Sequence, residues 1–444
     1  MNRTANYNVF GLYSHRWAIF AATFCLTLVL TQPAQAEIFH CGGGNVACLI
    51  AAINLANVNG HKNTIVLEAG AYTLSAVDND TNGPNGLPSI TSTLTIKGVA
   101  GANATGITRI SGGPPQVPYF RLMHVAASGN LALQGVTLSG GFCPSCDGNG
   151  LYNDGGVVTV TDSLFANNGF SLGTGGLASI AGTVNITGSR FTGNGAMQAG
   201  ALMLYGGTAS IKKSTFDHNH AEGVGAIGLC PNGLCGVASP SNEAILTVSD
   251  SAFTDNSDVF GLNIGGIAII GTSTATISNT TFARNGSGSF DEAAAILNDS
   301  GTLHLNNVTL ADNIGSLGSP TLRTIGGTTT IRNSILARTI DSHSGTPSLP
   351  DCSGPVTSRG HNFIGNPTGC NINLQLSDQV GDPGLDAFQD NGQPGNGHFP
   401  LLPSSRAIDT GAVPCPRKDQ IGQLRVNECD TGAIAFYDGI DALP

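Results

Sequence analysis

The stretch at 78–83 reads DNDTNG and carries oxygen ligands at the spacing of a calcium loop. Such loops place carboxylate and amide oxygens at alternate positions and a glycine at the sixth, where the chain turns sharply. Asp78, Asp80 and Asn82 are therefore the predicted ligands of a calcium ion, the one cofactor that the sequence suggests. Ser89 stands where the closing glutamate belongs. Asx- and glycine-rich turns give the same pattern without a metal, so both interpretations stay open.

A second set of reactive side chains recurs at one position of a repeat. His218, Asp255, Arg284 and Asp312 each stand two residues after a large apolar residue, at successive spacings of 37, 29 and 28. A repetitive fold would place these imidazole, carboxylate and guanidinium groups in a line, which suits a linear glycan or a partner strand. The alternative is an ordinary solvated surface, because exposed charged side chains need no function.

Catalytic motifs are weakly represented. The chain contains neither an HExxH metal motif nor a P-loop. The charged residues of the repeats are scattered and do not form two acids at a defined separation, as glycoside hydrolysis requires. These observations favour binding over catalysis.

The cysteines indicate an oxidising compartment. Of the 11 cysteines, Cys25 lies in an N-terminal apolar stretch, which leaves ten. An even number in an exported chain favours disulfides, and the ten fall in neighbouring twos. The five predicted disulfides are Cys41–Cys48, Cys143–Cys146, Cys230–Cys235, Cys352–Cys370 and Cys415–Cys429. For the CxxC at 143–146, a redox or zinc role is the alternative.

Residues 1–36 have the pattern of a cleavable export signal. Arg3 and Arg16 are basic, 18–30 is apolar and too short to span a membrane, and Ala34-Gln-Ala36 is a small-x-small cleavage site. A short membrane anchor is the alternative. No later segment is long and apolar enough to cross a bilayer, so we expect a secreted or cell-surface protein.

The positions of these groups depend on a repeat with a period near 26 residues. A period of this size indicates a solenoid. Each unit contains a glycine-rich apolar piece, a segment of alternating polarity, and a third segment that ends in Phe-x-x-Asn. The large apolar residue of the third segment, called the anchor, recurs at Phe165, Phe191, Phe216, Phe253, Phe282, Leu310 and Leu336. Three short strands in each unit predict an all-β chain, a parallel β-helix, because helical repeats need ~33 residues or more.

An asparagine follows most anchors by three residues. It recurs at Asn168, Asn194, Asn219, Asn256, Asn285 and Asn313. Equivalent positions in a β-helix stack at ~4.8 Å, so their amides can bond to one another and to the corner backbone. We therefore interpret this column as structural.

The two ends differ from the middle. Residues 46–57 form the one convincing helix, predicted to cap an open end of the solenoid and protect its strand edges. We expect an N-terminal cap and first coils at 37–130, the β-helix repeats at 131–340, and a disulfide-bearing C-terminal module at 341–444.

Composition agrees with a β-rich exported protein. Glycine contributes 62 of 444 residues and charged residues only 11%, which argues against a helical bundle. The net charge of −11 argues against nucleic acid and anionic membranes as partners.

Several motifs resemble those of secreted β-helix families. ACLIAAINLAN and TIVLEAGAYTLS within 47–75 resemble the N-terminal module of CSLREA-type proteins, although Ile50 and Ala51 replace its Arg and Glu. The glycine-rich and FxxN repeats resemble those of polymorphic outer-membrane adhesins. GDPGL at 381–385 and LLPSSRAIDTG at 401–411 resemble a choice-of-anchor Q module. The resemblance implies a right-handed, pectin-lyase-like β-helix on a secreted or surface protein, and no particular chemistry.

Two function classes follow. The first is a non-enzymatic, monomeric scaffold for adhesion that binds an extracellular glycan or surface protein. The second is a polysaccharide lyase or glycoside hydrolase on the same fold. The resemblance implies that an enzyme of this second class carries out catalysis with a basic residue beside a calcium-binding aspartate cluster, or with paired acids. The regular repeat favours the first class.

Overall fold

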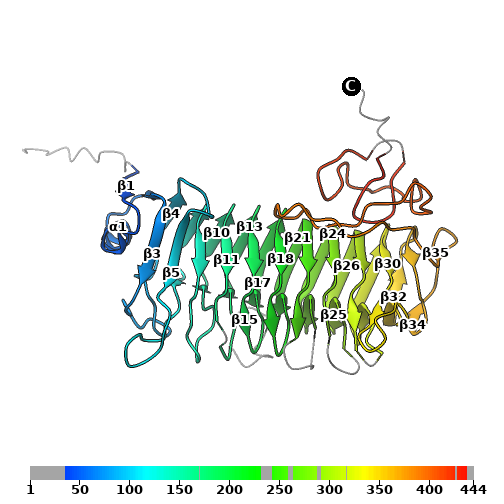
Figure 1. The fold of residues 1–444 in the computed structure, drawn as a ribbon, viewed down its shortest axis with the longest axis horizontal. Coiled ribbons are helices and arrows are strands. Elements are labelled where there is room, and N and C mark those ends of the chain that lie inside the picture. The colour runs from blue at the N-terminus through cyan, green and yellow to red at the C-terminus, as the bar shows by residue number, and fades with distance from the viewer. Residues whose placement is uncertain are drawn as a thin grey trace, which may run out of the picture. The chain divides into compact units, whose positions relative to one another are not determined.

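The computed structural model describes residues 36–169, 171–231, 243–258, 264–287, 292–316, 318–425 and 428–437. Within residues 36–437 the chain forms a parallel β-solenoid of about 11 turns (Figure 1). This confirms the predicted fold class. The predicted export signal, up to residue 35, lies outside the described residues.

Each turn contributes strands to three stacks. The first stack contains β2 (Asn63–Leu67), β4 (Thr93–Gly98), β7 (Asn130–Gln134), β10 (Val157–Thr161), β13 (Thr183–Thr187), β17 (Gly207–Lys212), β29 (Thr328–Arg332), and the first halves of β21 (Ala244–Thr254), β24 (Thr274–Ala283) and β26 (Thr302–Ala311). Alternating polarity explains these strands, since Val158 and Val160 are fully buried while Thr159 between them points outward.

The second stack, called the anchor sheet, carries the anchor residues. It contains β3 (Gly70–Leu74), β5 (Thr105–Arg109), β8 (Thr137–Ser139), β11 (Leu164–Ala166), β14 (Arg190–Thr192), β18 (Thr215–Asp217), the second halves of β21, β24 and β26, then β30 (Ile335–Ala337), β33 (Phe363–Ile364) and β35 (Gln379–Val380). Its phenylalanines stack inside the coil with ring centroids 4.5–4.9 Å apart from Phe165 to Phe282.

The third stack comes from the glycine-rich pieces. It contains β6 (Met123–Val125), β9 (Leu151–Asp154), β12 (Leu177–Ile180), β16 (Leu202–Tyr205), β20 (Ile227–Leu229), β23 (Ile267–Ile270), β25 (Ile296–Asp299), β28 (Leu322–Thr324) and the start of β32 (Cys352–Ser358). Short strands pair beside the corners: β15 (Gly195–Ala196), β19 (His220–Ala221) and β22 (Ser257–Asp258), and separately β27 (Ile314–Gly315) and β31 (Ile340–Asp341).

The asparagine column forms the predicted ladder. From Asn168 to Asn285, each side-chain amide donates to the Oδ1 of the next member at 2.9–3.0 Å. The same amide groups donate to the backbone carbonyl of an anchor one turn earlier, as Asn219 does to Phe191 at 2.8 Å. The ladder thus satisfies polar groups that are fully buried at the corner.

The N-terminal cap is also confirmed. Helix α1 (Val46–Val58) starts at Asn45, whose side chain accepts a hydrogen bond from the Cys48 amide. It buries Leu49 and Ile53 against the first coil, next to β1 (Ile38–Cys41), which pairs with β2.

Beyond residue 340 the chain first continues the coils and then runs back along them. Parallel pairing extends through β32, β33, β34 (Cys370–Ile372) and β35. Residues 381–425 and 428–437, called the return segment, then lie over the outward side of the anchor sheet (Figure 1, orange to red, past β21, β24 and β26). Antiparallel bridges Leu385–Leu401 and Gln389–His398 make 385–401 a hairpin.

Four of the predicted disulfides are present in the described residues. They are Cys41–Cys48, Cys143–Cys146, Cys352–Cys370 and Cys415–Cys429. Cys230 is also disulfide-bonded, and its predicted partner Cys235 lies outside the described residues. The disulfides indicate an oxidising environment. Among the described residues, no helix is long and apolar enough to cross a membrane.

Candidate functional site

Two columns of left-handed corners border the anchor sheet. Residues three before each anchor have φ of 43–58°, and residues two after each anchor have φ of 52–63°. The earlier column is Asp162, Gly188, Lys213, Asp250, Asn279, Asn307 and Asn333, and the later column is Asn167, Gly193, His218, Asp255, Arg284, Asp312 and Arg338. Asn, Asp, His and Gly are enriched at such φ, so backbone geometry explains part of the polar character of both columns.

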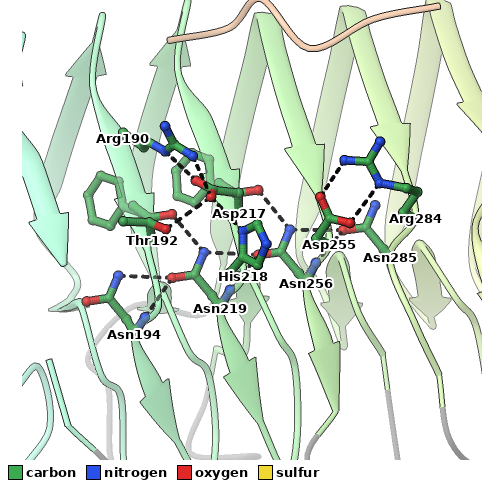
Figure 2. Close-up of polar contacts among 12 residues, drawn as sticks. Arg190, Thr192, Asn194, Asp217, His218, Asn219, Asp255, Asn256, Arg284 and Asn285 are labelled. Carbon is green, nitrogen blue, oxygen red and sulfur yellow. Dashed lines mark hydrogen bonds and ion pairs between the residues drawn. The ribbon is translucent and has the colours of Figure 1, made fainter. Parts of the chain in front are cut away.

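The predicted binding residues lie in the later column and are joined by ion pairs. Arg284 donates two hydrogen bonds to the Asp255 carboxylate at 2.6 and 2.7 Å (Figure 2). Arg338 lies 2.8 Å from the Asp312 carboxylate one step further along the column. Opposite charges on adjacent turns therefore pair, as expected for stacked positions.

His218 is held by an aspartate that the sequence reasoning did not single out. The Asp217 carboxylate lies 2.8 Å from His218 Nδ1 and accepts two hydrogen bonds from Arg190 at 2.7 Å (Figure 2). Burial of Asp217 opposes ionisation, but the hydrogen bonds from Arg190 and His218 outweigh it and hold the pKa of Asp217 below its ordinary value. The sequence signal was an acid directly after the anchor Phe216, facing a basic residue directly before Phe191.

The return segment covers much of this column. The Arg284 guanidinium lies 4.1 Å from the centroid of the Phe388 ring, and Arg338 lies 5.1 Å from that of Phe399. His218 stays open, with its side chain 66% exposed. The structure therefore places the four predicted residues along one line, and their role in binding stays a prediction.

Further toward the N-terminus the outward side of the anchor sheet is uncovered and hollowed. Two hollows of about 680 and 500 Å³ share Ala102, Asn103 and Leu164, and together form one groove. The groove crosses β3, β5, β8, β11 and β14, which at ~4.8 Å per strand is ~20 Å long. Its walls include Gly106, Thr137, Thr192, Arg190 and Lys213.

The groove ends where the return segment begins to cover the sheet. Gly392, Gln393 and Pro394 at the hairpin tip line its last part. Immediately beyond, the outward residues Thr215 and Ala252 are 3% and 0% exposed. The extent of the groove is thus set by where the hairpin stops, which no local sequence pattern encodes.

The predicted calcium loop makes contacts of its own. Asn79 accepts hydrogen bonds from the Thr81 amide and from Asn85 and Ser89 side chains. Asn82 donates to Asp154 at 2.7 Å, and its backbone carbonyl accepts a hydrogen bond from Arg121. The bonds around Asn79, and a guanidinium on the backbone carbonyl of the third predicted ligand, favour the Asx-turn interpretation. Among the described residues, no group of three or more His, Cys, Asp and Glu side chains is placed to hold a metal ion.

The sequence reasoning also missed a buried charged cluster behind this loop. Arg121 is 1% exposed and stacks on Tyr152 at 4.5 Å, and burial lowers its pKa to about 10. His124 bonds to Ser89 at 2.9 Å. Burial, and then the charge of Arg121, lower the pKa of His124 to about 4. Asp147 accepts a hydrogen bond from Tyr205 at 2.9 Å, and burial raises its pKa. The cluster is packed rather than open, so we interpret it as structural.

One further motif has a structural explanation. Residues 169–173 read GFSLG, the letters of a nucleophile elbow. Ser171 is buried and donates to the Thr174 carbonyl, and the next described element is strand β12. The strand–turn–helix setting that exposes a nucleophilic serine does not follow it in the described part of the chain.

Comparison with known proteins leaves the fold as the main guide to function. No protein-family model, no curated protein and no solved structure matches the chain.

Proposed function

We propose that this chain is an exported, non-enzymatic β-solenoid that binds an extended glycan in the groove of the anchor sheet. The observation that carries the proposal is the groove itself, which runs across five stacked strands and stays uncovered, while outward residues on the next turns, such as Thr215 and Ala252, are buried. A groove ~20 Å long matches a linear ligand better than a compact one.

The chemistry of the groove walls supports a glycan. Asn103 supplies an amide that both donates and accepts. The Thr137 and Thr192 hydroxyls donate to the Ala102 carbonyl and the Asp217 carboxylate, and they keep lone pairs that can accept from sugar hydroxyls. Lys213 adds a cation near the hairpin tip. Asp162 lines the same part of the groove and offsets the charge of Lys213, while Arg190 is paired with Asp217, so a neutral or weakly charged polysaccharide fits this lining best.

Other features support a function outside the cell. The disulfides suit an oxidising compartment, and the pattern at 1–36 is that of an export signal. We infer that the chain belongs with the secreted β-helix proteins of the CSLREA and choice-of-anchor Q type that its motifs resemble. An adhesion role follows from a binding surface on such a protein.

The column of His218, Asp255, Arg284 and Asp312 is proposed as an extension of this surface. His218 is its exposed member and lies on the turn where the groove ends. The other three are engaged in ion pairs with neighbouring turns, so their contribution is to hold the rim in shape.

A polysaccharide panel tests the proposal. The mature chain from residue 37 is incubated with neutral and acidic polysaccharides, and both retention and release of oligosaccharides are measured. We expect saturable binding without chain cleavage. Release of reducing ends or unsaturated products would replace the proposal with the hydrolase or lyase alternative. If the chain binds no member of the panel, the proposal is contradicted.

A further inference from the structure

The return segment contains a pocket of its own. Its volume is about 510 Å³, within the ~300–1,000 Å³ range of small-molecule sites. The floor is apolar and buried, formed by Leu401, Ile434 and Ala435. The hairpin 385–401 supplies one wall, and Ile421, Gln423 and residues 434–437 supply the other.

The polar groups at its mouth are free to bind. The side-chain amides of Gln389, Asn396 and Gln423 make no hydrogen bond to any residue that the structure describes. Gln389 and Gln423 are exposed and Asn396 is half-buried, so water bonds to these amides in the free protein and a ligand can displace it. Three such amides around one pocket can serve a ligand that offers both donors and acceptors.

The charged side chains in the lining indicate which class of ligand the pocket favours. The lining includes one carboxylate, Asp390, and neither lysine nor arginine. Phosphate, sulfate and carboxylate ligands need a cation or a cluster of backbone N–H groups to offset desolvation, so a neutral ligand fits better.

Two aromatic rings complete the pocket. Phe436 is half-buried in the wall, and Tyr437 is 50% exposed at the mouth. Such rings give rigid apolar faces against which a ring with one apolar face can pack. We propose that this pocket binds a single neutral pyranose ring, with the aromatic residues on its C–H face and the free amides on its hydroxyls.

This site goes beyond the proposed groove and is separate from it. The two linings share no residue, although the hairpin borders both, with Gln389 and Asp390 on the pocket and Gly392 and Gln393 on the groove. The chain would then hold a polysaccharide along the solenoid and a terminal or free sugar in the return segment.

The test uses the intact mature chain and methyl glycosides of glucose, galactose, mannose and N-acetylglucosamine, with glucuronic acid as the charged comparison. Saturation-transfer NMR titrations give affinities for the parent, Tyr437→Ala and Gln423→Ala. Both substituted side chains are exposed, so a melt is expected to show parent-like folding. Gly106→Trp, which obstructs the groove and leaves the pocket intact, is the control.

We expect at least one neutral glycoside to bind saturably, about tenfold more weakly to each pocket variant and unchanged to Gly106→Trp. The proposal is overturned if no neutral glycoside binds, if both pocket variants bind as the parent does, or if glucuronic acid binds as tightly as the neutral sugars. Loss of sugar binding only in Gly106→Trp would assign the sugar to the groove and overturn the pocket site, while leaving the proposed function intact.

Discussion

The side-chain amide of Asn219 donates a hydrogen bond to Asn256 Oδ1 at 3.0 Å although the two residues are 37 positions apart in sequence. The preceding step of the ladder joins Asn194 to Asn219 over 25 positions with the same geometry. The extra residues are accommodated between β20 and β21 without shifting the register, since Phe216 still pairs with Phe253. What stays constant from coil to coil is therefore the position of the asparagine and of the anchor within the coil, and not the number of residues in the repeat.

The ladder predicts a stability cost for its inner members. Replacing Asn219 or Asn256 by Leu should lower the free energy of unfolding by about 1–3 kcal/mol, because buried amide and carbonyl partners lose their hydrogen bonds. Denaturant titration measures the change. Asn185→Leu, on the outward side of β13, is the control and should be nearly neutral. Parent-like stability in both ladder variants would show that the ladder does not stabilise the fold.

Much of the solenoid is predictable from local patterns. Alternating polarity in 157–161 and the spacing of Phe165 and Phe191 predict a buried strand and a stacked anchor, because each coil repeats the same environment. A serine two before the anchor was missed: Ser189 accepts a hydrogen bond from the Ser163 amide of the neighbouring coil and donates to the carbonyl of Thr187. Its signal is present in the sequence as a Ser or Thr that recurs two residues before most anchors.

Docking of the hairpin depends on a glycine at a close approach. Gly395 has φ of 78°, and a Cβ atom there would lie 2.6 Å from the Asp250 carbonyl oxygen. Gly395→Ala should therefore loosen residues 385–401, seen as at least about tenfold faster amide exchange in that hairpin by mass spectrometry.

Gly392→Ala is the matched control for this prediction. Its φ of 79° imposes the same backbone strain, but nothing lies within 4 Å of the added Cβ. Equal loosening in both variants would attribute the effect to turn strain and contradict the docking role of Gly395.

Acidification should destabilise the folded chain because His124 is buried in its neutral form. Its pKa falls from an ordinary 6.5 to about 4 in the folded chain, so between these values the unfolded state binds a proton that the folded state does not. The free energy of unfolding contributed by this group therefore decreases as pH falls from 6.5 to about 4, by up to about 1.4 kcal/mol per pH unit.

His124→Gln isolates this contribution. Unfolding is measured for the parent and the variant at several pH values in that window, and the difference between them is compared. The parent should lose more stability than the variant on acidification. Parallel pH profiles would show that His124 titrates normally in the folded chain.

The column that the sequence predicted as a binding strip is tested by single alanine variants of His218, Asp255, Arg284 and Asp312. Each is assayed with the tightest ligand from the polysaccharide panel after a melt confirms folding. We expect His218→Ala to bind several-fold more weakly, because His218 is exposed beside the groove. If all four variants bind as the parent does, the strip is not part of the site.

The groove could not be predicted because it depends on a distant contact. Arg284 and Phe388 are 104 positions apart, and their stacking is one of the contacts that hold the hairpin on the anchor sheet. The local sequence around Leu164 and Thr192 resembles that of the covered turns, so periodicity alone gives no reason for one half of the sheet to be open.

The affinity of Gly106→Trp for the tightest polysaccharide of the panel tests the groove most directly. Gly106 lies in the groove with open space around a Cβ atom and without a positive φ, so the indole fills the groove without straining the backbone. Ser210→Trp, on the exposed side of the first stack, adds the same side chain elsewhere. The account predicts at least about tenfold weaker binding for Gly106→Trp and parent affinity for Ser210→Trp. A folded Gly106→Trp that binds as tightly as the parent would contradict it.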